Sequence, residues 1–441
     1  MITKINTGNT SKKRIFFLSI PIFFSNLAVP FIGIIDTGLM GNLGETKYLV
    51  ATSIGSTIMA MVIWSFGFLR MGTVGIIAQL FAKSDYREII RTIIRNFFLA
   101  ITISIFIIIL TPIIIGLTSN FFKISFDTLE LTKIYITVRA FSAPAELILY
   151  VIVGFYLGIQ KTNISSSIII TMSILNMIIS SFCVLTLDLN VFGVALGTLI
   201  ANYVTMIIFL YFTYRFIFKK FQIIPTLNKL IISSKFIKLL TINYDIFLRS
   251  LFLTFSFLWF TYLGSKIGED FLAINTILLQ FVILASFLLD AFAFSTEGII
   301  GFAIGRKNKK SFLSAVKNSV ELSFFSALIL SVLYLLFFKS IINILTDVDV
   351  LRFISYKHAI WVILIPPLAS FCYQLDGIFI GAAQTKDMRN GMIISVFIYV
   401  IVSIYLIKFF DNHGLWLSLL IFMSLRALTL RYFFSNILRK F

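Results

Sequence analysis

Long runs of apolar residues, separated by short polar breaks, make up most of the chain. A run of about 20 apolar residues is long enough to cross the hydrocarbon core of a membrane as a helix. Every backbone polar group must be satisfied in hydrocarbon, and these runs are too long and too uniformly apolar for barrel strands. We therefore predict an all-α polytopic membrane protein with twelve transmembrane helices, at about 15–41, 49–80, 92–116, 131–158, 165–187, 191–218, 241–264, 271–304, 313–345, 355–383, 390–410 and 414–437.

The second half of the chain repeats the first at one fixed offset, the spacing that separates Gly75 from Gly298. Gly75-Ile76-Ile77 recurs as Gly298-Ile299-Ile300, and Pro144, Gly154, Gly158 and Thr162 recur as Pro367, Gly377, Gly381 and Thr385. Six helices per half is an even number, so both halves enter the membrane in the same sense, as two parallel pseudo-symmetric six-helix lobes. We expect an N-terminal lobe at 1–218, a cytoplasmic linker at 219–238 and a C-terminal lobe at 239–441. Transporters hold substrate at such repeat interfaces, whereas the alternative is an inert duplicated scaffold.

Composition narrows the class of protein further. Hydrophobic residues make up 59% of the chain and charged residues only 13%, against about 25% charged in a soluble domain. This excludes a soluble enzyme, a disordered protein and, with only two cysteines, a secreted disulfide scaffold. The net charge of +18 could suggest a nucleic-acid partner, but the lysines and arginines alternate between rich and poor loops. That alternation is the positive-inside pattern, so we expect both termini in the cytoplasm, anionic membrane lipid as a partner and no nucleic acid.

Asp36 is the sharpest candidate for chemistry. It lies about 32 Å along the first helix from the basic residues at 12–14, in the outer part of that helix. Six residues earlier, Pro30 removes a backbone donor and loosens the helix. An ionisable group at bilayer depth is costly, and removal from water disfavours the charged form of a carboxyl group. A carboxyl group that gains a proton outside and loses it inside would couple a proton gradient to export. The alternative is an aspartate with a purely structural hydrogen-bonding role.

Other acidic residues inside the apolar runs are candidates for the substrate site. Asp290 and Glu297 are seven residues apart, on one face of the eighth helix, and could accept a cationic substrate or a proton. The alternative is that they form ion pairs with Arg70 or Arg249. Asp376 lies between the repeated Pro367 and Gly381 and could serve either function or helix packing. Asp245 and Arg249 are spaced as a structural i,i+4 ion pair.

Several motifs together resemble the multidrug and toxic compound extrusion (MATE) family. In the first half these are Ile20-Pro21-Ile22, Asp36-Thr37-Gly38-Leu39-Met40-Gly41 and Gly72-Thr73-Val74-Gly75-Ile76-Ile77-Ala78-Gln79. The second half resembles the DinF-type subgroup, in Asn243-Tyr244-Asp245-Ile246-Phe247-Leu248-Arg249, Leu289-Asp290-Ala291-Phe292-Ala293-Phe294-Ser295-Thr296-Glu297 and Leu375-Asp376-Gly377-Ile378-Phe379-Ile380-Gly381-Ala382. The resemblance implies two six-helix lobes around a central cleft, and proton- or sodium-driven efflux of lipophilic, often cationic compounds.

The resemblance also implies a cation-coupling site in the first lobe. The family's site residues match here at Asp36, Asn176 and Thr198. The fifth-helix pattern in the family is usually Asn-x-x-x-Asp, but here Ser180 follows Asn176 in place of the second acid. A sodium site would want more oxygen charge, so the loss of this carboxylate favours protons.

We therefore expect a proton-coupled exporter in a bacterial inner membrane, acting by alternating access and as a monomer. A sodium-coupled exporter, a lipid-linked precursor flippase and a major-facilitator carrier are the alternatives among transporters. A membrane enzyme is the alternative from another class, but the sequence shows no convincing nucleophile–base pair. No metal or cofactor is expected, because the two histidines, His358 and His413, are far apart in sequence and no phosphate-binding loop is complete.

Overall fold

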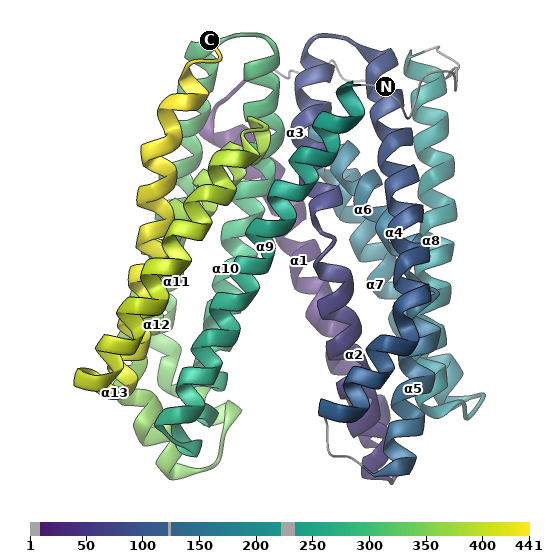
Figure 1. The fold of residues 1–441 in the computed structure, drawn as a ribbon, viewed down its shortest axis with the longest axis vertical. Coiled ribbons are helices and arrows are strands. Elements are labelled where there is room, and N and C mark those ends of the chain that lie inside the picture. The colour runs from purple at the N-terminus through teal and green to yellow at the C-terminus, as the bar shows by residue number, and fades with distance from the viewer. Residues whose placement is uncertain (1–8, 122–124, 222–233) are drawn as a thin grey trace. The chain divides into compact units, whose positions relative to one another are not determined.

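The computed structural model describes residues 9–121, 125–221 and 234–441, and every regular element in them is a helix (Figure 1). The helices are α1 (Lys12–Gly41), α2 (Thr46–Trp64), α3 (Phe68–Ala82), α4 (Tyr86–Phe121), α5 (Phe126–Ala140), α6 (Ala143–Gly158), α7 (Thr162–Leu185), α8 (Asn190–Phe221), α9 (Ser234–Ile267), α10 (Glu269–Gly305), α11 (Lys309–Leu345), α12 (Asp349–Gly381) and α13 (Thr385–Leu438).

The helices account for the predicted membrane spans. In the described residues, ten helices are long and apolar enough to cross a membrane, with α2 and α3 counted together as one span, Thr46–Ala82. The helices α5 and α6, bent by 46°, together form an eleventh span. The 54-residue α13 divides at Asp411, whose φ of 46° and ψ of −129° are not helical. Figure 1 shows its two parts running in opposite directions side by side. This division brings the described spans to the twelve that the sequence predicts.

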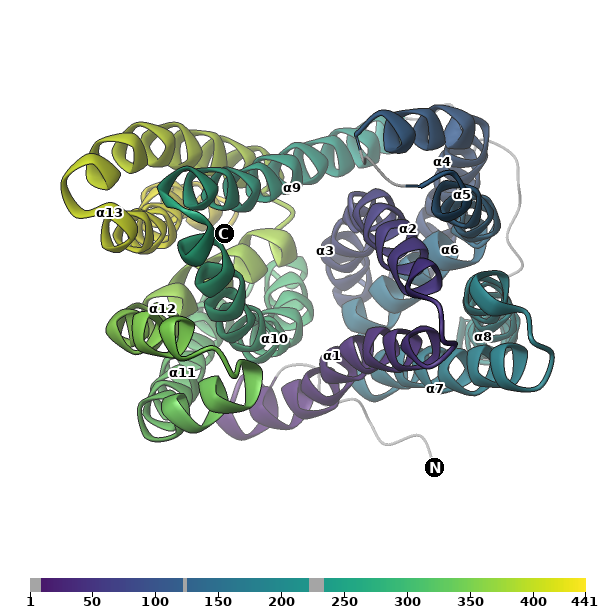
Figure 2. The same ribbon diagram turned by 90° about the horizontal axis from the view of Figure 1, so that it is seen from below.

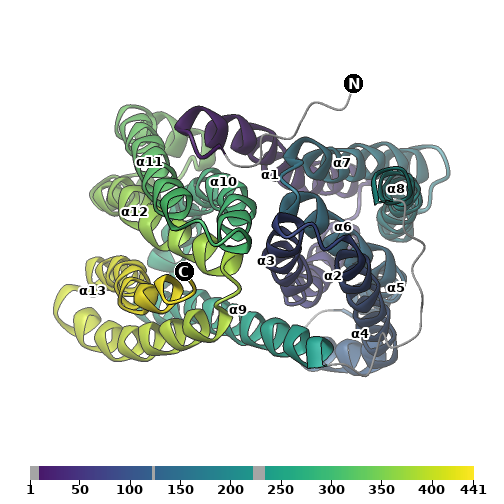
Figure 3. The same cartoon turned by 90° about the horizontal axis from the view of Figure 1, so that it is seen from above.

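The described chain packs as two compact units. The C-terminal unit contains the described residues up to Phe23 together with Thr241–Phe441, and the N-terminal unit contains those of Phe24–Leu240. In the views along the helices, α10, α11 and α12 lie side by side in the C-terminal unit, as α7 and α8 do in the N-terminal unit (Figures 2 and 3). The units place the first residues of the chain differently from the expected lobes.

Two polar contacts explain why the start of α1 belongs to the C-terminal unit. Lys12 Nζ lies 2.6 Å from Glu321 Oε2 on α11, and the hydroxyl of Thr10 donates to Ser314 Oγ at 3.0 Å. The expected linker also differs at its ends, because α8 continues through Lys219 to Phe221 and α9 begins at Ser234. Lysine is compatible with a helix C-terminus, where its charge complements the helix dipole. Residues 222–233 of that linker lie outside the described residues.

The repeat is visible in the closest helix contacts. A Cβ atom placed on Gly154 of α6 would lie 2.6 Å from the carbonyl oxygen of Arg70 on α3, and one on Gly377 of α12 would lie 2.7 Å from that of Ala293 on α10. One turn further, the same contact pairs Gly158 with Val74 and Gly381 with Glu297. The contacted residues are also one repeat offset apart, Arg70 from Ala293 and Val74 from Glu297. The two units therefore share the same glycine-mediated helix packing.

The helix ends repeat in the same way. Left-handed backbone conformations occur at equivalent positions of the two halves, in the pairs Ser84 and Lys307, Gln160 and Ala383, and Asp188 and Asp411. Because a non-glycine residue rarely adopts a positive φ, three matched pairs indicate a common backbone path. The internal repeat predicted from the sequence is thus a structural repeat.

Candidate functional site

Asp36 lies in the N-terminal unit, in the last two turns of α1. Its side chain is buried, with 8% exposed, and within the described residues its Oδ1 atom has no hydrogen-bond partner. The charged side chain of Arg139 on α5 lies within electrostatic range of it. One turn further along α1, Met40 packs in a buried apolar cluster with Tyr135, Val194 and other residues of α2, α5, α7 and α8. Asp36 is therefore a buried carboxyl group beside an apolar cluster, with spare acceptor capacity.

The other three predicted coupling residues meet where α7 packs against α8. The side-chain amide of Asn176 donates to Thr198 Oγ1 at 2.7 Å, and the Thr198 hydroxyl donates to the carbonyl oxygen of Val194 at 3.1 Å. Ser180, one turn along α7, donates to the same carbonyl at 3.5 Å. The structure thus brings Asn176, Ser180 and Thr198 together, and it records no hydrogen bond from any of them to Asp36 in the described residues.

One oxygen atom at this contact between α7 and α8 lacks a hydrogen-bond donor in the described residues. Asn176 is 1% exposed, and its Oδ1 atom has no hydrogen-bond partner among the described residues. A buried, unpartnered oxygen costs free energy unless a proton donor or a cation satisfies it. The N-terminal unit therefore holds two such oxygens on predicted coupling residues, one from Asp36 and one from Asn176.

Ser180 occupies a tight contact between two backbones. A Cβ atom placed on Gly197 of α8 would lie 2.7 Å from both the backbone nitrogen and the Cα atom of Ser180. The hydroxyl of Ser180 packs on this glycine and is fully buried. The position that carries an acid in the usual family pattern here holds a small side chain whose hydrogen bond stays within the helix contact.

Sequence reasoning missed a charged cluster next to this region. Arg139 Nη1 lies 3.3 Å from Glu146 Oε2 and also donates to Ser142 Oγ, across the bend between α5 and α6. Asn202 of α8 donates to the same Glu146 oxygen at 3.4 Å. Both charged residues are visible in the sequence as ionisable groups within apolar runs, but only the bend brings them together. Arg139 therefore interacts with two acids, Asp36 and Glu146.

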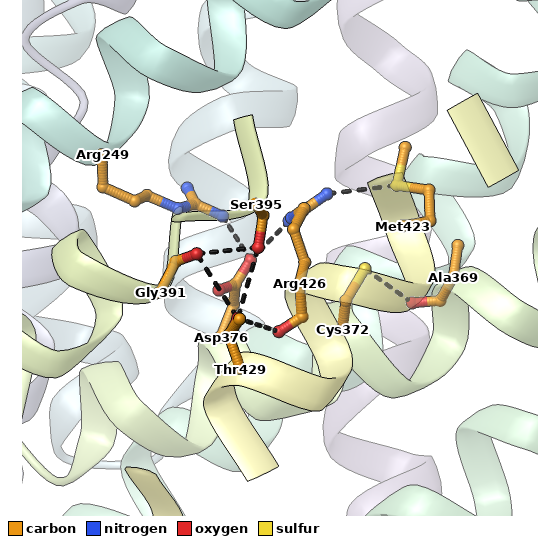
Figure 4. Close-up of polar contacts among 9 residues, drawn as sticks. All are labelled: Arg249, Ala369, Cys372, Asp376, Gly391, Ser395, Met423, Arg426 and Thr429. Atoms are coloured by element: carbon orange, nitrogen blue, oxygen red, sulfur yellow. Dashed lines mark hydrogen bonds and ion pairs between the residues drawn. The ribbon is translucent and has the colours of Figure 1, made fainter. Parts of the chain in front are cut away.

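In the C-terminal unit, Asp376 is bound by two arginines (Figure 4). Its Oδ2 atom accepts hydrogen bonds from Arg426 Nη2 of α13, at 2.7 Å, and from Arg249 Nη2 of α9. Asp376 is 6% exposed and Arg426 2% exposed. The Asp376 carboxylate thus joins α9, α12 and α13.

The expected pair of Asp245 with Arg249 is wrong. Asp245 instead accepts hydrogen bonds from Arg389 Nη1 at 2.7 Å and from Thr385 Oγ1 at 3.0 Å, both on α13. Arg249 turns to Asp376. Buried charges here are compensated by neighbouring helices, which offer partners that the spacing along a single helix does not reveal.

Asp290 and Glu297 lie on α10, as predicted. Asp290 is half-buried, whereas Glu297 is fully buried and its backbone oxygen meets Gly381. Asp290 lies within electrostatic range of Tyr373 on α12, a residue that also interacts with Arg426. The two acids therefore differ in exposure, although they lie two turns apart on one helix.

The sequence pattern of the family described as MatE matches residues 21–182 and 246–407, one stretch in each repeated half. The chain belongs to the MatE family. The predicted resemblance is confirmed, and the major-facilitator alternative is wrong.

Two curated relatives support the MatE assignment over most of the chain. The DNA damage-inducible protein F of Escherichia coli (strain K12) is 33% identical over 96% of this chain and 91% of its own length. A probable multidrug resistance protein NorM of Photorhabdus laumondii is 24% identical over 85% of this chain and 83% of its own. A solved outward-facing structure of a multidrug resistance MATE transporter has a TM-score of 0.88 at 19% identity, covering 98% of this chain and 97% of that one, and so has the same fold.

The two MatE repeats differ at the coupling positions. At the offset of the repeat, Asp36 corresponds to Trp259 and Ser180 to Ser403. The indole nitrogen of Trp259 donates to Ser403 Oγ at 3.0 Å, and Asn176 corresponds to Tyr399, which is fully buried. The second repeat therefore fills the equivalent of the Asp36 site with aromatic side chains and has no carboxyl group there.

Proposed function

We propose that this MatE protein is a proton-coupled antiporter that exports lipophilic, often cationic compounds by alternating access, with Asp36 carrying the coupling proton. The observation that carries the proposal is the buried carboxyl group of Asp36, whose Oδ1 atom has no hydrogen-bond partner in the described residues. Buried ionisable groups in membrane proteins mark ion and proton pathways. The multidrug names of several relatives support export as the direction of transport.

The available ligands support a proton as the coupling ion. A metal cation wants several oxygen ligands with net negative charge, whereas a proton needs a single carboxyl oxygen. Ser180 stands where a second acid could have added charge, and its hydroxyl is bonded to Val194. This set favours a proton over sodium.

Arg139 supports a reversible change of charge at Asp36. A buried guanidinium left without a partner is costly. Because Arg139 also pairs with Glu146, it keeps one acidic partner when Asp36 is neutral. We propose that Asp36 takes up a proton from outside and releases it inside, while α1 bends near Pro30 between the two states.

The substrate contact is proposed on α10 rather than at Asp376. The Asp376 carboxylate already accepts hydrogen bonds from two arginines, whereas Asp290 is half-buried. Asp290, with Glu297 two turns away on the same face, is the acid we propose for contact with a cationic substrate. The site requires no catalytic residue, because the proposed transport leaves the covalent bonds of the substrate unchanged.

The proposed location is a bacterial inner membrane with both termini in the cytoplasm. Its support is the positive-inside distribution, with 24 lysines and arginines in the segments assigned inside and 8 in those assigned outside. We propose that the protein works there as a monomer.

The experiment is dye efflux from proteoliposomes under an imposed gradient of one ion at a time. With ethidium as the probe, a pH gradient should drive transport and a sodium gradient of equal size should not. Transport that follows the sodium gradient and ignores the pH gradient would overturn proton coupling, and no transport under either gradient would overturn ion-driven export.

A further inference from the structure

A partly open cavity of about 440 Å³ lies in the N-terminal unit among α6, α7 and α8. It is separate from the region of Asp36. Met40, one turn from Asp36, packs with Val194 near the start of α8, whereas the cavity is lined by residues between Phe209 and Lys219 near the end of α8. Its apolar lining includes Tyr156, Phe209, Phe212 and Phe216, and its two cations are Arg215 and Lys219.

The aromatic wall of the cavity is held in place by its neighbours. The ring of Phe216 lies 6.1 Å from that of Phe155 and 6.2 Å from that of Tyr156, and the Thr213 hydroxyl donates to the Tyr156 hydroxyl at 3.2 Å. Phe212 is half exposed, at 52%. The wall therefore presents an apolar surface to whatever surrounds α8.

The charged end of the cavity has one sign. Arg215 donates to the Tyr211 hydroxyl at 3.3 Å, and in the described residues neither Arg215 nor Lys219 forms an ion pair. Lys161 adds a third cation at the rim, with its Nζ atom 4.2 Å from the centroid of Phe216. None of the residues that line the cavity in the described chain is acidic. The lining therefore complements an anion attached to an apolar group.

The surrounding surface is that of a membrane-facing helix. Around the cavity, large apolar side chains of α8 are exposed, namely Ile207, Tyr211, Tyr214 and Phe218. Aromatic and basic side chains near the end of a span are typical of the membrane–water interface. With the proposed orientation, on which this inference rests, the cations lie at the level of the cytoplasmic headgroups.

We propose that this cavity binds an anionic phospholipid of the cytoplasmic leaflet. Its phosphate lies between Arg215 and Lys219, and an acyl chain lies against Phe209 and Phe212. Basic pockets between helices on the cytoplasmic side recognise acidic headgroups in this way. The occupant is a lipid rather than a soluble anion because the aromatic wall is continuous with the exposed apolar face of α8.

The test is retention of phosphatidylglycerol by the purified full-length protein, measured by native mass spectrometry against phosphatidylethanolamine. The wild-type protein should prefer phosphatidylglycerol. The double variant Arg215→Gln/Lys219→Gln should lose about 25-fold in affinity for it, since each cation near a headgroup contributes about a fivefold factor. The charge-preserving variant Arg215→Lys/Lys219→Arg should retain the preference.

The matched control removes the same charge elsewhere on the proposed cytoplasmic face. Lys309→Gln/Lys310→Gln changes two exposed lysines at the start of α11 and should leave phosphatidylglycerol binding at the wild-type level. Equal loss in both double variants, or none in the cavity variant, would overturn the proposal. Competition by inorganic phosphate as effective as that by the lipid would also overturn it. Binding is measured without transport, so failure here differs from failure of proton coupling.

Discussion

At the scale of residues, Asp36 and Asp376 are two buried carboxyl groups in contrasting surroundings. Asp376 Oδ2 accepts hydrogen bonds from two arginines, whereas Asp36 keeps an oxygen without a hydrogen-bond partner in the described residues. A carboxylate paired with two guanidiniums holds helices together. A carboxyl group with spare acceptor capacity can exchange a proton without dismantling a structural contact.

Replacing Asp376 should therefore cost stability before it affects substrate recognition. Asp376→Ala strands two buried arginines, and we expect a loss of about 3–5 kcal/mol in the free energy of unfolding. Arg426→Met leaves the pair of Asp376 with Arg249 and should cost less, about 1.5–3 kcal/mol. Thermal unfolding in detergent measures both. Asp376→Ala with wild-type stability and a raised KM for a cationic dye would contradict the structural role.

The sequence identified several of the site residues, but it could not identify their partners. Asp36 stands out because acids are rare within apolar runs, whereas Asn176 and Thr198 were identified only through the family resemblance. The structure joins Asn176 to Thr198. Spacing along one helix suggested that Asp245 pairs with Arg249, yet each is bound by a different neighbouring helix. The same limit applies to the histidines, because the rings of His358 and His413 stack 4.1 Å apart although they are distant in sequence.

At the scale of elements, the repeat fixes how the helices pack. Glycines at equivalent positions of the two halves let α6 approach α3 and α12 approach α10 through equivalent backbone atoms. This part of the fold was predictable, since the apolar runs gave the spans and the matched glycines gave the repeat. The ends of the polar linker were harder to predict. Lysines near the end of α8 and the start of α9 suggested a loop from the sequence, but they belong to the helices.

Adding a methyl group at either repeated glycine should produce a similar penalty. Gly154→Ala and Gly377→Ala each force a Cβ atom to within 2.7 Å or less of a carbonyl oxygen, and we expect a loss of about 1–3 kcal/mol each. Gly116→Ala is the control, because no atom lies within 4 Å of the added Cβ. Thermal unfolding decides the question, and tolerance of alanine at both repeated positions would contradict the close packing.

At the scale of the whole molecule, α1 belongs to both compact units. The division falls after Phe23, two residues beyond Pro21 and seven before Pro30. α9 likewise begins in the N-terminal unit and continues in the other. Prolines remove backbone hydrogen bonds and let a helix bend, so α1, which also carries Asp36, is suited to link a change of charge to movement of a unit.

Stiffening α1 should slow transport without unfolding the protein. Pro30→Ala restores a backbone donor, so we expect unchanged or higher thermal stability. If bending then costs about 1.4 kcal/mol more, efflux becomes about tenfold slower. Pro144→Ala is the control, because Pro144 lies in the first turn of α6, where proline is compatible with the helix. Efflux at the wild-type rate in Pro30→Ala would contradict a role for the bend.

Proton movement during ethidium transport tests most directly whether Asp36 carries the coupling proton. Proteoliposomes that contain a pH-sensitive dye report proton movement when ethidium is added to wild-type protein or to Asp36→Asn, which keeps the size of the side chain but cannot titrate. We expect ethidium-dependent proton movement in the wild type and none in the variant, with equal thermal stability and equal amounts of reconstituted protein. Ethidium-dependent proton movement of the same size in both would contradict it.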